Sequence, residues 1–121
     1  MAIPLFAGEK APLPAKLLNA KTALLVNESI SPKVYDALYD QLKKWNHFQI
    51  VESKERADIV IVFSSHIVLG GLQSYYYLRI ADPKDDKPDT ALWSDSCGEG
   101  ISISYPARKM VSTLRKRMDK K

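Results

Sequence analysis

One short group of residues in this sequence has the types needed for nucleophilic catalysis. Ser64, Ser65 and His66 are consecutive and follow an apolar run, where α/β folds often place ligands. A hydroxyl nucleophile beside an imidazole base would support hydrolysis. Adjacent side chains on an extended segment point apart, however, and no Gly-x-Ser-x-Gly elbow surrounds these serines. We therefore predict no catalytic residue here and a protein that is not an enzyme.

The residue types that bind metals and phosphates are scattered along the chain. His47 follows a predicted helix and is expected to be a helix-end residue rather than a ligand. Four aspartates in the polar stretch 82–89 have the composition of a calcium loop but lack its alternation, its glycine and its final glutamate. Gly70-Gly71 lacks the lysine and the spacing of a phosphate loop. We predict neither a metal site nor a cofactor site.

Cys97 is the single cysteine, so neither an intramolecular disulfide nor a cysteine-based zinc site can form. The neighbouring Gly98 and Gly100 favour an exposed position in a loop. No histidine or basic residue next to it in sequence would lower the pKa of its thiol, so we expect an inert cysteine.

The tyrosines near residue 75 form the most informative surface candidate. In a strand over 75–81, alternation places Tyr75, Tyr77 and Arg79 on one face. If helices do not cover that face, these three residues form an amphipathic patch suited to protein recognition. If helices do cover it, the tyrosines are core residues. Both alternatives remain open, and Tyr75, Tyr77 and Arg79 are the candidate protein-interaction surface.

The elements that would position these residues follow from hydrophobic periodicity and turn chemistry. Ser31-Pro32 predicts a helix start, and Asn46 predicts its end in a left-handed conformation. Apolar residues at helical spacing fall between them. Ile59 to Phe63 has no alternation, which indicates a central strand that is buried on both faces. The predicted strands are 21–26, 48–51, 59–63, 75–81 and 91–94, and the predicted helices are 32–45 and 105–118. Residues 64–74 and 96–102 are predicted loops, and the apolar piece 67–69 could instead extend the third strand.

This order, β-α-β-β-β-β-α, predicts an α+β fold with two layers. We expect a mixed sheet of about five strands with both helices packed on one face. Residues 1–15 contain Pro4, Pro12 and Pro14 and predict an extended arm, and 16–121 predict a single α/β domain. Apolar side chains Leu38, Leu42, Ile61, Trp93 and Leu114 are expected to share one core.

The net charge of +4 makes the protein only mildly basic. Much of the excess lies in the basic carboxyl terminus, 115–121, where cations complement a helix dipole or form a polyanion-binding patch. We do not expect nucleic acid as the partner, because its binding rests on many phosphate contacts. The sequence has no apolar stretch long enough to span a membrane and no signal peptide at Met1, although a removed export signal stays possible.

Four features together resemble a group of exported bacterial domains: Ala57-Asp58 before an apolar strand, Asp82 before a polar turn, Leu92-Trp93-Ser94, and the terminal helix. The group includes the amino-terminal domain of TolB, the curli-secretion lipoprotein CsgG and lipoprotein activators of penicillin-binding proteins. Their turn often reads Asp-x-x-Thr-Gly-x-x-x-Trp. Asp82 and Trp93 match it, but a longer loop replaces the Thr-Gly. The resemblance covers about residues 20–118.

The resemblance implies a periplasmic or cell-envelope location, a possible lipid anchor on the precursor, and binding of a protein partner or self-association. It implies no catalytic residues. We therefore expect a non-enzymatic envelope-associated binding or assembly domain. The alternative is a cytoplasmic α/β domain that binds a nucleotide or nucleic acid.

Overall fold

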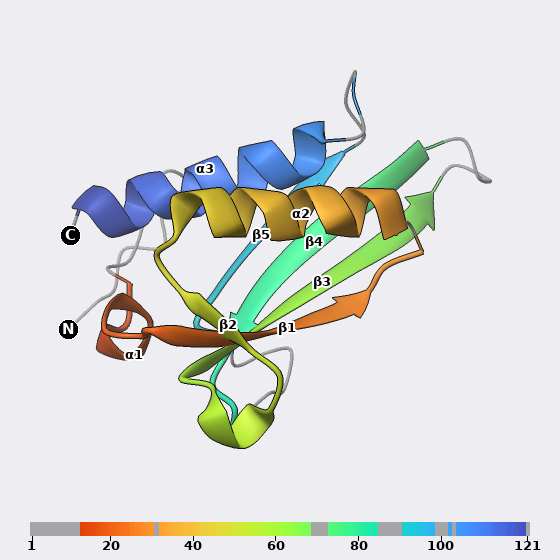
Figure 1. Ribbon diagram of the computed structural model, residues 1–121. Helices are drawn as coiled ribbons and strands as arrows, with labels where there is room; N and C mark the ends of the chain where they lie inside the picture. Colours follow the sequence, from red (N-terminus) through yellow and green to blue (C-terminus); the bar gives the residue numbers. More distant parts are fainter. Residues whose placement is uncertain are drawn as a thin grey trace, which may run out of the picture.

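The computed structural model describes residues 13–30, 32–68, 73–84, 91–98, 102 and 104–120, and shows a two-layer α+β fold (Figure 1). One layer is a mixed five-stranded sheet, and the other consists of the two long helices. The elements are α1 (Ala15–Leu18), β1 (Thr22–Glu28), α2 (Pro32–Trp45), β2 (Gln49–Val51), a 3-10 turn η1 (Lys54–Arg56), β3 (Ile59–Val68), β4 (Gln73–Ala81), β5 (Trp93–Gly98) and α3 (Tyr105–Lys120).

The strand order in the sheet is β2-β1-β3-β4-β5, so β3 lies at the centre. β2 and β3 both pair with β1 in parallel, whereas β4 pairs with β3 and β5 in antiparallel fashion. The predicted central strand is confirmed, because all five residues from Ile59 to Phe63 are buried. The brief strand β2 lies at an edge, and β5 forms the other edge.

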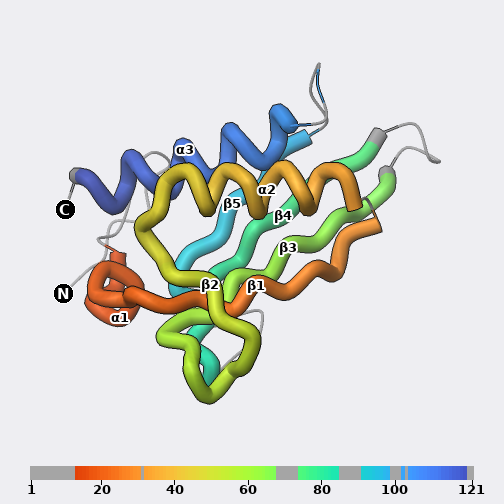
Figure 2. Tube along the Cα trace, in the orientation of Figure 1, coloured from red at the N-terminus to blue at the C-terminus, as the bar shows by residue number. Residues whose placement is uncertain are grey.

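Both long helices lie side by side on one face of the sheet and run in the same direction (Figure 2). Helix α2 has the predicted bounds. Asn46 follows it with φ 57°, and its N–H donates to the Leu42 carbonyl at 3.0 Å, the single bond of a left-handed helix stop. Helix α3 begins at Tyr105, and the Ser104 carbonyl accepts from the Arg108 N–H at 3.0 Å.

The core lies between the helical layer and the sheet. Leu38 and Leu42 of α2, Ile61 of β3 and Leu114 of α3 are at most 2% exposed and belong to one cluster, and Trp93 packs against it partly buried. This confirms the predicted core. Across the sheet the Phe63 and Tyr76 rings stack with centroids 5.8 Å apart and nearly parallel planes.

One short element was not predicted, and the bounds of two strands differ from the prediction. The one-turn helix α1 was not predicted, because Pro14 and its neighbours favoured an extended arm; residues 1–12 of that arm lie outside the described residues. The strand β3 continues through Val68. The polar residues 64–66 had predicted a loop, whereas the alternative of a longer third strand agrees with the structure up to Val68. The strand β5 spans 93–98 rather than the predicted 91–94. The prediction ended too early because the polar run Ser94, Asp95 and Ser96 does not show the apolar-polar alternation of a half-buried strand.

Candidate protein-interaction surface

The three candidate residues lie on the face of the sheet that α2 and α3 leave uncovered, which we call the helix-free face. Tyr76, Leu78 and Ile80 of β4 are buried in the core under the helices. Because side chains alternate along a strand, Tyr75, Tyr77 and Arg79 point to the other side. The structure thus decides between the two packing alternatives: these residues are not core residues beneath the helices.

The register of the sheet places neighbours in rows across the helix-free face. Tyr77 lies opposite Ser64 of β3 and Ser96 of β5. Tyr75 lies opposite His66, an exposed side chain on β3. Tyr77 is itself 38% exposed, one of the four most exposed large apolar residues among those described. The residues directly opposite the two tyrosines on β3 thus carry a hydroxyl and an imidazole group, and Val62, opposite Arg79, is the next residue on the same face.

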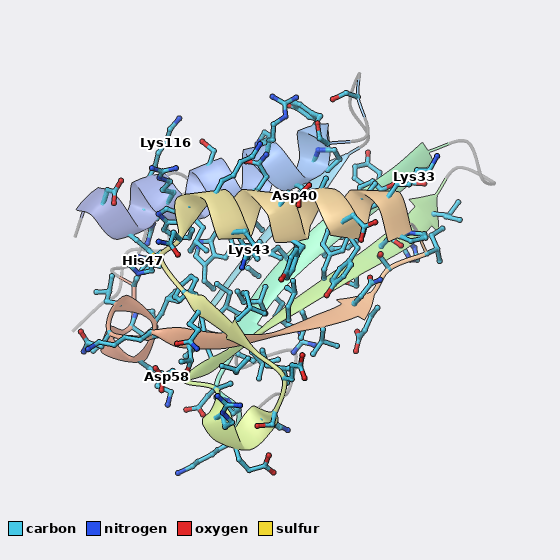
Figure 3. All side chains as sticks on the ribbon, viewed as in Figure 1. Lys33, Asp40, Lys43, His47, Asp58 and Lys116 are labelled. Atoms are coloured by element: carbon cyan, nitrogen blue, oxygen red, sulfur yellow. The ribbon has the colours of Figure 1, made fainter. Side chains whose placement is uncertain are left out.

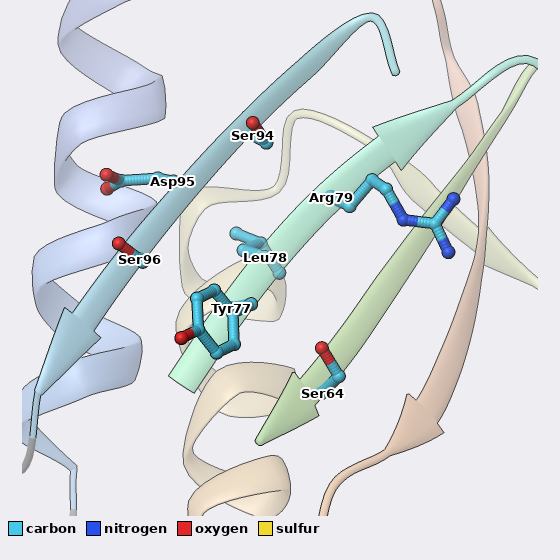
Figure 4. Close-up of a pocket in the computed structure, with 7 residues that line it drawn as sticks. All are labelled: Ser64, Tyr77, Leu78, Arg79, Ser94, Asp95 and Ser96. Atoms are coloured by element: carbon cyan, nitrogen blue, oxygen red, sulfur yellow. The ribbon is translucent and has the colours of Figure 1, made fainter. Parts of the chain in front are cut away.

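A shallow hollow of about 460 Å³ opens on this face (Figure 4). Tyr77 and Arg79 lie along β4 beside Ser64, and the neighbouring strand β5 adds its serines (Figure 4). The lining residues are Ser64, Tyr77, Leu78, Arg79, Ser94, Asp95 and Ser96. Aromatic, cationic and hydroxyl groups are thus arranged around a concave part of the sheet, where they can accept a side chain from another molecule.

The other end of the helix-free face, away from Tyr75 and Tyr77, carries apolar side chains that are buried. Val60 lies opposite Ala81 on one side and Leu24 on the other, and Leu24 lies opposite Val51. Val51, Val60 and Ala81 are at most 5% exposed. The accessible part of the face is therefore the end that carries Tyr75, Tyr77 and His66.

Among the residues that suggested catalysis, the structure places Ser65 and His66 on opposite faces of β3, whereas Ser64 shares the helix-free face with His66. The Ser65 hydroxyl accepts a hydrogen bond from the Ile30 N–H at 3.0 Å, which ties the loop before α2 to β3. His66 is the next residue on the same strand, so its side chain points to the opposite face. The hydroxyl of Ser65 and the imidazole of His66 are thus not brought together.

Cys97 is buried, and the expectation of an exposed cysteine was wrong. It lies on the side of β5 that faces the core and is 8% exposed. Burial raises the pKa of its thiol, and the nearby Asp95 adds to this, whereas Lys109 acts in the opposite direction. The thiol donates a hydrogen bond to the Gly98 carbonyl at 3.3 Å. Both burial and the raised pKa favour the unreactive thiol form.

Asp58 has a structural role that the sequence analysis did not identify. Its Oδ2 accepts hydrogen bonds from the N–H of Lys21 at 2.8 Å and of Thr22 at 3.3 Å. In return, the Asp58 N–H donates to the Thr22 hydroxyl at 2.9 Å. The Lys21 bond, above all, lowers the pKa of the Asp58 carboxyl. These bonds join the beginnings of β1 and β3. The position of an aspartate just before a buried strand was the sequence signal that could have predicted this role.

The residues considered as metal ligands do not form a cluster in the part of the chain that the structure describes. No group of three or more histidine, cysteine, aspartate or glutamate side chains suited to a metal is found among the described residues. His47 stacks on Trp45 with ring centroids 4.8 Å apart. In the acidic turn, Asp82 accepts from the Lys84 N–H at 2.9 Å, and the other three aspartates lie outside the described residues.

In comparisons with known proteins, no family model matches the chain and no curated protein matches it. Among the described residues, none of the helices has the length and apolar character needed to cross a membrane.

Proposed function

We propose that this chain is a non-enzymatic binding domain of the bacterial cell envelope that holds a protein partner on its helix-free face. One observation supports this most: both long helices occupy the same side of the sheet, so Tyr75 and Tyr77 stand on the other side, where Tyr77 lines a hollow. Tyrosine and arginine are the residue types enriched in protein interfaces, because they bury large areas with little loss of rotamer freedom.

The composition of the face favours a different protein over a permanent homodimer. Permanent dimer interfaces resemble a domain core and are rich in aliphatic residues. Here Ser64, Ser94 and Ser96 line the hollow around Tyr77. We propose a partner segment with an apolar side chain that packs on the Tyr77 ring and polar groups that bond to these hydroxyls. The envelope location rests on the resemblance to exported bacterial domains.

The test is cross-linking in native cells followed by purification of the tagged full chain. The variant Tyr75→Ala with Tyr77→Ala should reduce recovery of the cross-linked partner by about tenfold, the loss expected when aromatic anchors are removed. Tyr39→Ala is the matched control, because Tyr39 lies on α2 and has the same 38% exposure as Tyr77. Equal recovery by the folded double variant and the control would refute the proposed surface. Recovery of only a second copy of the chain would refute the heterologous partner.

The proposed location is tested separately by fractionation of cells that express the native gene. The protein is expected in the envelope fraction, and the precursor is expected to carry an export signal with a lipid-modified cysteine. A protein found only in the cytoplasmic fraction would contradict the envelope location without affecting the surface assignment.

A further inference from the structure

The positive charge of the protein is concentrated in the helical layer. Helices α2 and α3 carry nine lysines and arginines against three aspartates, a net charge of +6. The remaining chain therefore holds nine of the 18 basic residues and 11 of the 14 acidic ones, a net charge of −2. The whole-chain charge of +4 conceals this separation. Because the helices run in the same direction, their basic carboxyl-terminal ends lie at the same end of the molecule (Figure 2).

A hollow of about 590 Å³ lies at this end, between α2 and the edge strand β2. Lys43 extends from α2 on the side of β2, and His47 lies just beyond the end of the helix (Figure 3). None of the described residues that line the hollow is an aspartate or a glutamate. The lining residues are Lys21, Tyr39, Lys43, Asn46, His47, Phe48, Gln49 and Ile50.

The groups around the hollow are mainly hydrogen-bond donors. Lys21 and Lys43 contribute ammonium groups that form no salt bridge within the described chain, and Lys43 lies over the Tyr39 ring at 5.9 Å. Among the described residues, no acceptor pairs with the backbone N–H of His47 or of Phe48. Asn46 and Gln49 add carboxamide groups. Among the described lining residues, an anion in this hollow would therefore meet two ammonium groups and two carboxamides, and no competing carboxylate.

Aromatic contacts hold the hollow in shape. The His47 ring stacks on Trp45 at 4.8 Å and meets Phe48 edge-on at 4.7 Å. The left-handed Asn46 directs the chain from the helix into β2. Rings that are fixed before binding lose little conformational entropy when a ligand arrives, so this aromatic side of the hollow is formed in advance.

The lysines also have a purely structural explanation, because Lys43 in the last turn of α2 complements the partial negative charge of the helix end. That explanation does not apply to Lys21, which precedes β1, or to the donors of His47 and Phe48. The helix end contributes about half an elementary charge. Two ammonium groups outweigh it, so the net field in the hollow favours an anion.

We infer that this hollow is a binding site for a small phosphate monoester with a planar ring, the size of a mononucleotide. A phosphate offers three acceptor oxygens and up to two negative charges, which suit this number of donors better than the two oxygens of a carboxylate. The volume exceeds that of a phosphate group alone and lies within the usual range of small-molecule sites. The exposed rings of Tyr39 and His47 supply the contact for the planar part.

The test is a titration of the ¹⁵N-labelled full chain, followed by NMR, with adenosine monophosphate and, separately, with adenosine. The monophosphate is expected to produce saturable shifts at Lys21, Lys43 and the 46–49 turn at concentrations below about 10 mM. Adenosine is expected to bind at least about tenfold more weakly, because it lacks the charge-assisted hydrogen bonds. Inorganic phosphate is expected to shift the same amides.

Matched lysine variants make the result specific. Lys43→Gln should weaken monophosphate binding by about fivefold or more, whereas Lys33→Gln, at the other end of the same helix, should leave it nearly unchanged. Both side chains are exposed, so neither change should affect folding.

Equal shifts by adenosine, no saturable shift, or equal loss in both variants would overturn the inference. Much tighter binding of a single-stranded oligonucleotide, with shifts spread over Arg115 and Lys116 of α3, would also overturn it in favour of a polyanion surface. The lining residues of this hollow and of the hollow on the helix-free face do not overlap. A negative result for the phosphate-binding hollow therefore leaves the proposed protein-binding face untouched, and the reverse also holds.

Discussion

At the residue scale, the bonds of Asp58 connect charge with stability. Its Oδ2 accepts hydrogen bonds from the backbone N–H groups of Lys21 and Thr22. Removal of the carboxylate would leave both N–H groups without this charged acceptor. We expect Asp58→Ala to lower the free energy of unfolding by about 1–2 kcal/mol, the usual cost of losing hydrogen bonds to a charged group. Asp58→Asn should cost less, because its amide oxygen still accepts. Urea melts at neutral pH measure both values; equal stability of wild type and Asp58→Ala would contradict the structural role.

The same carboxylate gives the protein an acid-sensitive contribution to stability. Folding lowers the pKa of Asp58, so the unfolded chain takes up this proton at higher pH than the folded chain. The contribution is present in full above the unfolded pKa near 4 and is lost as the pH falls through the lower folded value. Wild type should therefore lose more stability than Asp58→Asn between about pH 5 and pH 2. Parallel losses would contradict this assignment.

Cys97 is expected to react slowly with thiol reagents. Its thiol is buried against the core, and its pKa is raised, so little thiolate is present at neutral pH. The native protein should react with a disulfide reagent at least about tenfold more slowly than the protein in urea. Only in the unfolded chain is the thiol accessible and its pKa at the ordinary value. Equal rates in the two states would place Cys97 at the surface.

At the element scale, helix α2 and strand β3 depend on side chains in the shared core. Leu42 and Ile61 are at most 2% exposed and belong to the same cluster. Truncation of either to alanine should cost about 2–5 kcal/mol, through lost transfer energy and a residual cavity. Tyr39→Ala on the exposed side of α2 is the control and should change stability by less than about 1 kcal/mol. Denaturant unfolding measures all three, and a change below about 0.5 kcal/mol at both core positions would contradict the packing.

The elements that the sequence predicted well are those with strong local signals. Pro32 and Asn46 mark the two ends of α2, whose end has the expected positive φ, and the predicted cap Ser31 lies outside the described residues. Ile59 to Phe63 lacks polar residues because both faces of the central strand are buried. Two segments were predicted poorly. The polar half of β3 and the strand β5 face solvent on one side, and Asp95 even occupies the core side of the edge strand, so no period-two pattern appears.

The candidate site was predictable only in part. Alternation placed Tyr75, Tyr77 and Arg79 together, but which face the helices cover depends on tertiary packing, which no local pattern encodes. The serines that line the hollow come from β3 and β5, and the register that brings them to Tyr77 is a long-range property of the sheet. The basic hollow beside β2 was not predicted either, because Lys21 and Lys43 are distant in sequence.

At the scale of the whole molecule, the two layers separate two kinds of surface. The helical layer carries the excess positive charge, and the helix-free face presents tyrosines and hydroxyl groups. Because the core lies between them, side chains on either surface can change without disturbing the packing that holds the layers together. This arrangement suits a domain that binds through its surfaces.

The most direct test of the central claim is site-specific photocross-linking in native cells. A photoreactive phenylalanine analogue is placed at position 77 on the helix-free face or at position 39 on α2, two sites of equal exposure. The proposed function predicts one discrete adduct at position 77, formed with a different protein and absent at position 39. The same adducts at both positions, or none at position 77 in a folded chain, would contradict the claim that the helix-free face binds a partner.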